Sequence, residues 1–252
     1  MDSLGPSQPL SLGLCALRDR PVREAVALAA GLGYRAVQLD ARHEQVRPRA
    51  LDRSARRDLA AVLRRHELSL SGIDLWLPPE HLCPGPALER AAEAVQGAMA
   101  LIRDLAGLLP ACPVVSLTLP ARPDPLAMAA LQDASHRLEV ALADHAWPPP
   151  EDRRLGLDPA LVLLAGESPA RAVARLGDRL ASVRLSDADT TGRAIVGSAE
   201  GRLDVGAYAA ALAVSAPSVP IVADVRQLPD PLLAARRTLE AWRGALVPPV
   251  SG

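Results

Sequence analysis

Charged side chains stand at the ends of several short apolar runs of this chain. Asp158, Arg184 and Asp224 each lie at the end of such a run, and Arg226 follows Asp224 two positions later. Converging carboxylates can bind a divalent cation or move a proton. A guanidinium among them can pair with the carboxylates, or it can bind an anionic phosphate or carboxylate in a bidentate manner. The residue types alone leave both kinds of chemistry open.

The surrounding sequence predicts the elements that position these groups. Short runs rich in Val, Leu and Ala alternate with longer stretches that have apolar residues at helical spacing. This alternation is typical of an α/β protein with a parallel sheet. In such a protein, residues at the carboxyl ends of the strands lie on the face where ligands bind. We therefore expect the charged groups to meet at one edge of the sheet.

Seven strands are clear, and the fifth βα unit is where the pattern becomes irregular. A helix is predicted over residues 125–145, and the proline-rich break 147–152 leads directly into the next apolar run. Either the run 155–158 takes the fifth strand position in an irregular barrel, or the fifth strand is lost and the wall is patched. The predicted strands cover residues 10–16, 35–40, 68–77, 114–119, 155–158, 179–187 and 219–225.

The order of these motifs resembles the xylose isomerase-like TIM barrels, the sugar phosphate isomerase/epimerase superfamily. Residues 12–40, LGLCALRDRPVREAVALAAGLGYRAVQLD, resemble the first unit of that fold. The last two units are matched by GDRLASVRLSD at 177–187, IVGSAEGRLDVGAYAAAL at 195–212 and VPIVADVR at 219–226. The resemblance implies one (β/α)8 barrel over residues 1–252, irregular or truncated around the fifth βα unit. A length of 252 residues fits a single barrel domain.

The resemblance also implies a divalent metal, held by carboxylates and a histidine at the ends of strands five to eight. Asp158 matches the sixth-strand aspartate and Asp224 matches the eighth-strand acid, so both are candidate catalytic carboxylates and ligands of Mn²⁺, Mg²⁺ or Zn²⁺. The seventh-strand histidine is replaced by Arg184, and no counterpart of the fifth-strand glutamate is found. The site is thus expected to be degenerate: Arg184 replaces the metal by internal ion pairs, or it holds an anionic ligand.

Several polar residues near the predicted third strand are further candidates. Asp40 ends the second strand, where it can contact a substrate hydroxyl or cap the next loop. Asp74 and Trp76 end the third strand, and His81 follows in a proline-flanked loop. An aromatic ring beside a carboxylate and an imidazole can form a sugar-binding wall, with His81 as acid or base. The alternative is an ordinary loop with a packed tryptophan.

The end of the seventh unit holds the remaining candidates for ligand binding. Asp187 can contact a ligand directly or can serve as a cap or a partner of Arg184. In the loop 197–204, Arg202 or the backbone amides can bind phosphate, while Asp204 is expected to cap the following helix. Arg226 can line the pocket or form a structural ion pair with Asp224.

The composition excludes several classes of function. The chain has no lysine, so all 28 basic residues are arginine, and lysine-dependent aldolases, pyridoxal-phosphate enzymes and P-loop NTPases are excluded. A net charge of −1 predicts no binding to nucleic acid or to an anionic membrane. Cys15, Cys83 and Cys112 are scattered, and residues 1–10 do not resemble a signal peptide, which together predict a cytoplasmic protein.

The function predicted from the sequence is that of a sugar phosphate isomerase/epimerase-like protein with a degenerate metal site, acting on a small sugar or sugar phosphate. The alternative is a catalytically inactive barrel that binds a small anionic or sugar ligand, or a protein partner. The sequence indicates no oligomeric state.

Overall fold

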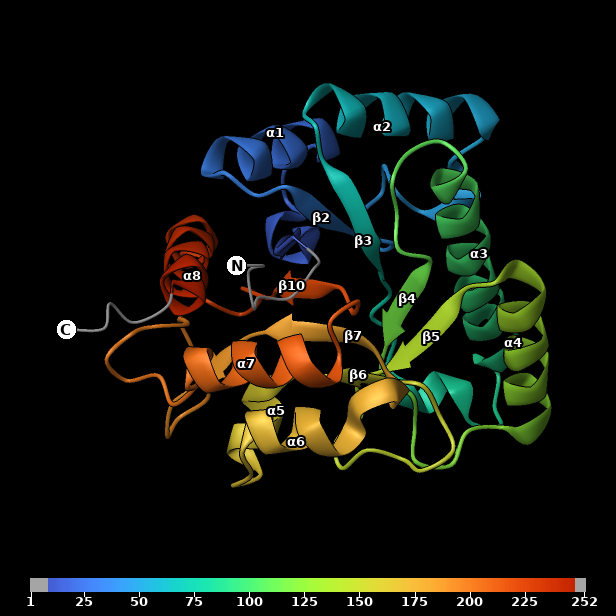
Figure 1. Ribbon diagram of the computed structural model, residues 1–252. Coiled ribbons are helices and arrows are strands. Elements are labelled where there is room, and N and C mark those ends of the chain that lie inside the picture. Colours follow the sequence, from blue (N-terminus) through green and yellow to red (C-terminus); the bar gives the residue numbers. More distant parts are fainter. Residues whose placement is uncertain (1–8, 248–252) are drawn as a thin grey trace.

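Eight parallel strands close into a barrel in the computed structural model of the chain, which describes residues 9–247 (Figure 1). Going around the barrel, the order is β1, β2, β3, β4, β5, β6, β7 and β10, and β10 pairs again with β1. The fold is therefore the predicted (β/α)8 barrel. The strands are β1 Ser11–Gly13, β2 Ala36–Asp40, β3 Ser69–Asp74, β4 Val114–Leu117, β5 Ala141–Asp144, β6 Leu155–Leu157, β7 Leu180–Leu185 and β10 Ile221–Ala223.

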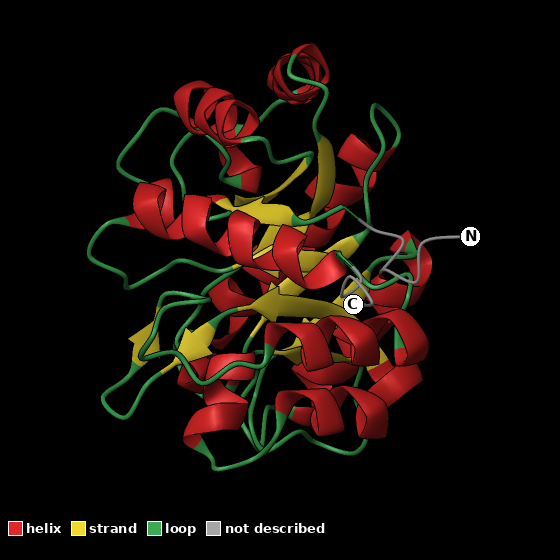
Figure 2. Cartoon of the chain, turned by 60° about the vertical axis from the view of Figure 1, so that its left-hand side comes forward, coloured by secondary structure: helices red, strands yellow, loops and turns green. Residues whose placement is uncertain are grey.

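Helices surround the strands in both overall views (Figure 1 and Figure 2). Most of them begin at an Asp or Ser whose side chain accepts a backbone N–H of the first turn, often followed by proline, as at Asp124 and Asp230. None of the described helices has the length and hydrophobicity needed to cross a membrane. The helices are α1 Val22–Leu32, α2 Arg53–Arg65, α3 Leu88–Ala106, α4 Pro125–Leu138, α5 Pro159–Leu164, α6 Pro169–Leu176, α7 Val205–Ser215 and α8 Pro231–Leu246.

Short elements complete the chain and lie mostly in the loops. One of them, a two-stranded antiparallel hairpin after β7, does not belong to the barrel. Residues 14–16, predicted as part of the first strand, belong to a 3-10 helix instead. Residues 1–8, which fall in the segment considered for a signal peptide, lie outside the described range. The short elements are η1 Leu14–Leu17, η2 Pro48–Ala50, η3 Pro79–Leu82, η4 Gly177–Arg179, β8 Asp187–Ala188 and β9 Arg193–Ala194.

The fifth strand is present, so both predicted alternatives for it are wrong. The helix predicted over residues 125–145 ends at Leu138, because Glu139 takes a left-handed conformation with φ of 53°. The next residues form β5 between β4 and β6, and residues 155–157 therefore occupy the sixth position. The predicted irregularity of the fifth βα unit is confirmed, but it lies in the connection from β5 to β6 and not in a missing strand. No helix lies in the fully described segment 145–154, and β5 meets β6 through the pair Asp144 and Leu155.

One layer of the barrel interior is polar. Gln38 Nε2 donates to Ser116 Oγ at 3.2 Å, and Ser116 Oγ donates to Ser182 Oγ at 3.3 Å. Because β4 and β7 are not neighbouring strands, the second bond crosses the interior. Successive residues on a strand face opposite sides, so residues two positions later also face inward. The short serine side chains leave room there for longer charged groups, of which Arg184 is one.

The backbone at position 72 in β3 accommodates only glycine. Its φ is +133°, and an added Cβ would lie 2.7 Å from the carbonyl oxygen of Val114. We expect Gly72→Ala to destabilise the protein by about 3 kcal/mol in urea unfolding, because the backbone conformation and the clash both oppose a side chain. Gly31→Ala is the control, since its Cβ would meet nothing within 4 Å in α1. Equal stabilities of the two variants would contradict this expectation.

Candidate functional site

Three carboxylates and three guanidiniums meet at the carboxyl-terminal mouth of the barrel. The acids come from the ends of β3, β6 and β10, which share one edge because all barrel strands are parallel. The bases come from β7, from β9 and from the loop after β10. We call this set the mouth cluster, and its members are Asp74, Asp158, Arg184, Arg193, Asp224 and Arg226.

Arg184 lies at the centre of the mouth cluster. Its Nη1 donates to Asp158 Oδ2 at 3.1 Å, and its Nη2 donates to Asp74 Oδ1 at 3.2 Å. Its Nε lies 3.3 Å from Asp224 Oδ2, and its side chain is only 9% exposed. The hydroxyl of Tyr208 donates to the backbone carbonyl of Arg184 at 2.9 Å. One guanidinium thus occupies the space between all three carboxylates.

Two further guanidiniums complete the pairing. Arg193 donates from Nη2 to Asp158 Oδ2, and its Nη1 lies 3.6 Å from Asp224 Oδ2. Arg226 donates from Nε to Asp224 Oδ1 at 2.7 Å and from Nη2 to Asp74 Oδ1 at 3.1 Å. Every carboxylate of the mouth cluster therefore contacts at least two guanidiniums. The three positive charges balance the three negative charges.

The paired arginines keep the buried carboxylates ionised. Burial by itself raises the pKa of Asp158, but Arg193 and Arg184 outweigh it and hold that pKa well below its usual range. Ser186 Oγ also donates to Asp158 Oδ1 at 2.5 Å. The pKa of Asp224 is likewise lowered, because Arg184 and Arg226 overcome the effect of burial. Both groups are carboxylates, and not carboxylic acids, near neutral pH.

Two uncharged titratable groups lie within electrostatic range of the mouth cluster. Burial first, and then the charge of Arg184, hold the pKa of His145 well below its usual range, so its imidazole is neutral. Within residues 9–247, neither ring nitrogen of His145 has a hydrogen-bond partner. Burial raises the pKa of Cys15 to about 12, so its thiol stays protonated. Cys15 is therefore not an activated nucleophile.

The fifth strand does end in an acid, which corrects the expectation that it has none. Asp144 ends β5 and is fully buried. Its Oδ1 accepts the backbone N–H groups of Leu119 and Ala146, both at 3.0 Å, and Arg153 Nη1 donates to its Oδ2 at 2.9 Å. Asp144 therefore fixes the loop between β5 and β6 by these contacts, and it forms no ion pair with the arginines of the mouth cluster.

Asp40 and Asp187 hold loops in place. Asp40 Oδ2 accepts from Arg18 Nε at 2.6 Å, and its Oδ1 accepts the backbone N–H of Arg42 at 2.9 Å. Asp187 Oδ1 accepts the backbone N–H groups of Arg202 and Leu203, each at 2.8 Å. Both aspartates are buried. In this structure their contacts are those of the capping alternative.

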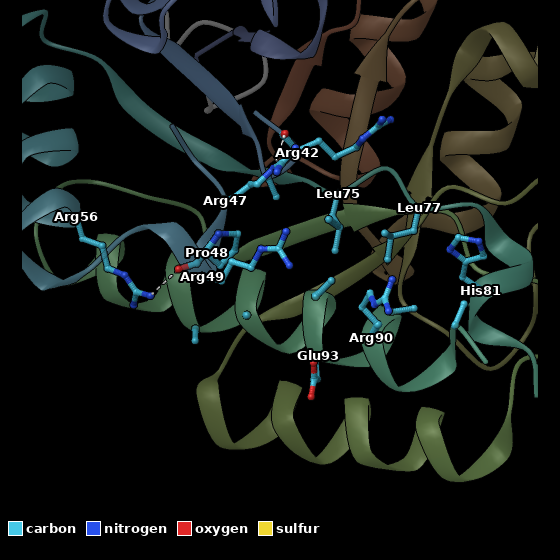
Figure 3. A pocket seen from close by; sticks show the side chains of 16 residues that line it. Arg42, Arg47, Pro48, Arg49, Arg56, Leu75, Leu77, His81, Arg90 and Glu93 are labelled. Atoms are coloured by element: carbon cyan, nitrogen blue, oxygen red, sulfur yellow. Dashed lines mark hydrogen bonds between the residues drawn. The ribbon is translucent and has the colours of Figure 1, made fainter. Parts of the chain in front are cut away.

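The remaining candidates lie apart from the mouth cluster. Arg202 is exposed in the loop before α7, where Asp204 accepts the N–H of Ala207 as the predicted cap. Trp76 is 49% exposed, and the guanidinium carbon of Arg42 lies 4.7 Å from the centre of its ring. His81 lies in η3 and lines a cavity between the loop after β2 and α3 (Figure 3).

No family model and no curated protein matches the sequence. Solved structures match over nearly the full length of both chains. D-psicose 3-epimerase with D-tagatose from Clostridium cellulolyticum H10 has a TM-score of 0.71 at 12% identity, covering 95% of this chain and 99% of that one. A xylose isomerase domain protein from Alicyclobacillus acidocaldarius subsp. acidocaldarius has a TM-score of 0.67 at 17% identity, with 95% and 98% covered. The fold is the TIM barrel that these structures share.

A third solved structure with this fold is described as the IOLI protein with a binding zinc atom. It has a TM-score of 0.65 at 12% identity, and the match covers 95% of this chain and 98% of that one. Identities this low establish the fold alone. Whether the present barrel suits a metal therefore depends on its own residues.

The mouth cluster does not fit a divalent cation. A metal site needs several oxygen or imidazole ligands around an open position. Here Arg184 and Arg193 lie between Asp158 and Asp224, and their positive charges repel a cation. Among the described residues, no three His, Cys, Asp or Glu side chains are grouped so that they could hold a metal ion. Internal guanidiniums thus occupy the position between the carboxylates.

Sequence reasoning missed three residues near this site: Arg193, His145 and Asp144. Arg193 belongs to a hairpin whose fold depends on tertiary contacts, and no local pattern marks it. His145 falls at the end of the helix predicted over residues 125–145, yet it follows β5 and is only 2% exposed. The acid that ends the apolar run 140–144 was the available signal for Asp144, since other strands of this chain also end in aspartate.

Proposed function

We propose that this chain is a ligand-binding xylose isomerase-like barrel that works without a divalent metal and binds a small anionic molecule. One observation supports this most strongly: Arg184 contacts all three carboxylates of the mouth cluster, at 3.1 to 3.3 Å. A buried cation fixed at this point takes the place that a metal would need. Five of the candidate residues at the strand ends thereby form ion pairs with one another, namely Asp74, Asp158, Arg184, Asp224 and Arg226.

The protonation states support a binding role. A general acid or base works best when its pKa lies near the working pH. The pKa values of Asp158 and Asp224 are lowered, that of His145 is held well below its usual range, and that of Cys15 is raised to about 12. None of these four pKa values is shifted toward neutral pH. We infer that the mouth cluster stabilises the barrel and does not transfer protons.

The second candidate function is sugar phosphate isomerisation or epimerisation. The observation that favours it is the likeness to D-psicose 3-epimerase over 95% of this chain. A sugar phosphate also has the anionic group that arginines recognise. Under this alternative, substrate binding would have to displace Arg184 from the carboxylates. Asp158, Asp224 and His81 would then take the catalytic roles that the sequence suggested. The three free cysteines suit a reducing cytoplasm in either case.

Calorimetry with Mn²⁺, Mg²⁺ and Zn²⁺ separates the two functions. We expect no saturable binding to the wild-type protein at the mouth cluster, because a cation must displace Arg184 and Arg193. The matched control is Asp158→Ala, which removes one carboxylate. Saturable binding that is lost in Asp158→Ala would contradict the proposal. Metal-dependent turnover of ketose or aldose phosphates would establish the second candidate.

A further inference from the structure

A second polar site lies beside the barrel mouth and is separate from the mouth cluster. Residues 41–56, the segment after β3 and the first two-thirds of α3 enclose a cavity of about 490 Å³ (Figure 3). This volume is in the range of sites that bind small organic molecules. It is far larger than an inorganic anion requires, so it has room for an organic body as well as a charged group.

The floor of this cavity is apolar because one face of α3, together with Ala87 before it, has only small residues there. Ala87, Ala91, Ala94, Gly97 and Ala100 recur every three or four positions, so they share one helix face. Without longer side chains, this face is recessed. Leu75 and Leu77 from the segment after β3, together with Pro48 from η2, supply apolar walls. The floor and walls are suited to an aliphatic or aromatic group.

The rim of the same cavity is strongly cationic. It includes five arginines and a single acid, Glu93, whose carboxylate points away from the arginines in Figure 3. Arg56 pairs with Asp104. Within residues 9–247, the other four arginines form no ion pair with a carboxylate, unlike the three arginines of the mouth cluster. These four are Arg42, Arg47, Arg49 and Arg90.

Two of the unpaired arginines come from different elements. Arg49 extends from η2 toward Leu75, and Arg90 rises from α3 toward Leu77 (Figure 3). Like charges gathered around a hollow repel one another and attract an anion. A guanidinium matches the geometry of carboxylate and phosphate oxygens through two parallel hydrogen bonds. The arrangement thus combines an anion-recognising rim with an apolar floor.

We propose that this arginine-rimmed cavity is the ligand site of the protein and binds an organic anion with an apolar body. The carboxylate or phosphate group lies between Arg49 and Arg90, and the apolar body packs on the alanine face of α3. This inference rests on the proposed function, because it names the site and the ligand class of an anion-binding barrel. It needs no metal and no group of the mouth cluster.

Titration calorimetry with four simple probes tests the ligand class. We expect phenyl phosphate and benzoate to bind saturably, whereas inorganic phosphate and benzyl alcohol bind at least about tenfold more weakly. Inorganic phosphate lacks the apolar body, and benzyl alcohol lacks the charge. The ratio of phenyl phosphate to benzoate affinity identifies the preferred anionic group. Equal affinities of all four probes, or no binding of phenyl phosphate and benzoate, would overturn the inference.

Variants at the rim and floor test the location. Arg49→Gln and Arg90→Gln should each weaken phenyl phosphate binding by about tenfold, and Ala94→Leu should weaken it further by filling the floor. Arg237→Gln, an exposed arginine on α8, is the matched control and should leave affinity unchanged. All three arginines are exposed, so melting temperatures should agree.

The outcomes separate this inference from the proposed function. If phenyl phosphate binds wild type but the three cavity variants behave like Arg237→Gln, the site assignment is wrong, while anion binding by the barrel stands. If the wild-type protein binds Mn²⁺ through Asp158, metal independence is wrong, while a loss of phenyl phosphate affinity in Arg49→Gln and Arg90→Gln would still support the cavity.

Discussion

Replacing Arg184 by methionine should lower the free energy of unfolding by about 3–5 kcal/mol, the cost of breaking a buried ion pair by removing one partner. Methionine fills much of the same volume but has no charge. Asp74, Asp158 and Asp224 would then remain buried with only two guanidiniums among them. The loss is large because the side chains of these carboxylates are at most 3% exposed, so water cannot replace the missing partner.

Urea unfolding at neutral pH measures this effect. Arg237→Gln is the control, because replacing this solvent-exposed arginine should change stability by no more than about 0.5 kcal/mol. Added salt should leave the difference between wild type and Arg184→Met nearly unchanged, since buried pairs are poorly screened. A loss below about 1 kcal/mol, the usual value for surface pairs, would mean that the mouth cluster is open to solvent.

Most of the fold could be predicted from the sequence because strand and helix periods alternate along the chain. The fifth strand could not. Residues 140–144, VALAD, continue the apolar spacing of the preceding helix, and alanine and leucine suit a helix as well as a buried strand. The boundary is set by Glu139 in a left-handed conformation, where glycine is the usual signal. Tertiary pairing with β4 then decides the outcome.

The candidate site was predictable only where it depends on strand ends. Asp158, Arg184 and Asp224 could be placed together because parallel strands share one edge. The role of Arg193 depends on how a hairpin folds over the barrel, which is a long-range property. The arginine-rimmed cavity depends on how closely η2 approaches α3. An added Cβ at Gly97 would lie 3.3 Å from Pro48 Cβ, and no local pattern encodes that approach.

Replacing Asp158 by asparagine should also be costly, and the cost should depend on pH. Asparagine keeps the volume and can still cap α5, but it leaves Arg184 and Arg193 without the carboxylate that contacts both. The expected loss near neutral pH is about 3 kcal/mol. The pKa of Asp158 is lowered in the folded protein. Its contribution to stability is therefore complete above the pKa of the unfolded chain, about 3.9, and disappears as the pH falls toward the folded value.

Urea unfolding of wild type and Asp158→Asn near neutral pH, at about pH 5 and at about pH 3 checks this dependence. The difference between the two proteins should be the same at the first two values and should shrink at the third, because at that pH the carboxyl group of the unfolded wild-type chain binds a proton that Asp158 of the folded protein does not. Asp230→Asn is the matched control, since Asp230 caps α8 at the surface without an arginine partner among the described residues. A difference that grows toward acid pH would mean that Asp158 is protonated in the folded protein. In that case it would be free to act as a general acid, and the catalytic alternative would gain the proton donor that the paired carboxylate lacks.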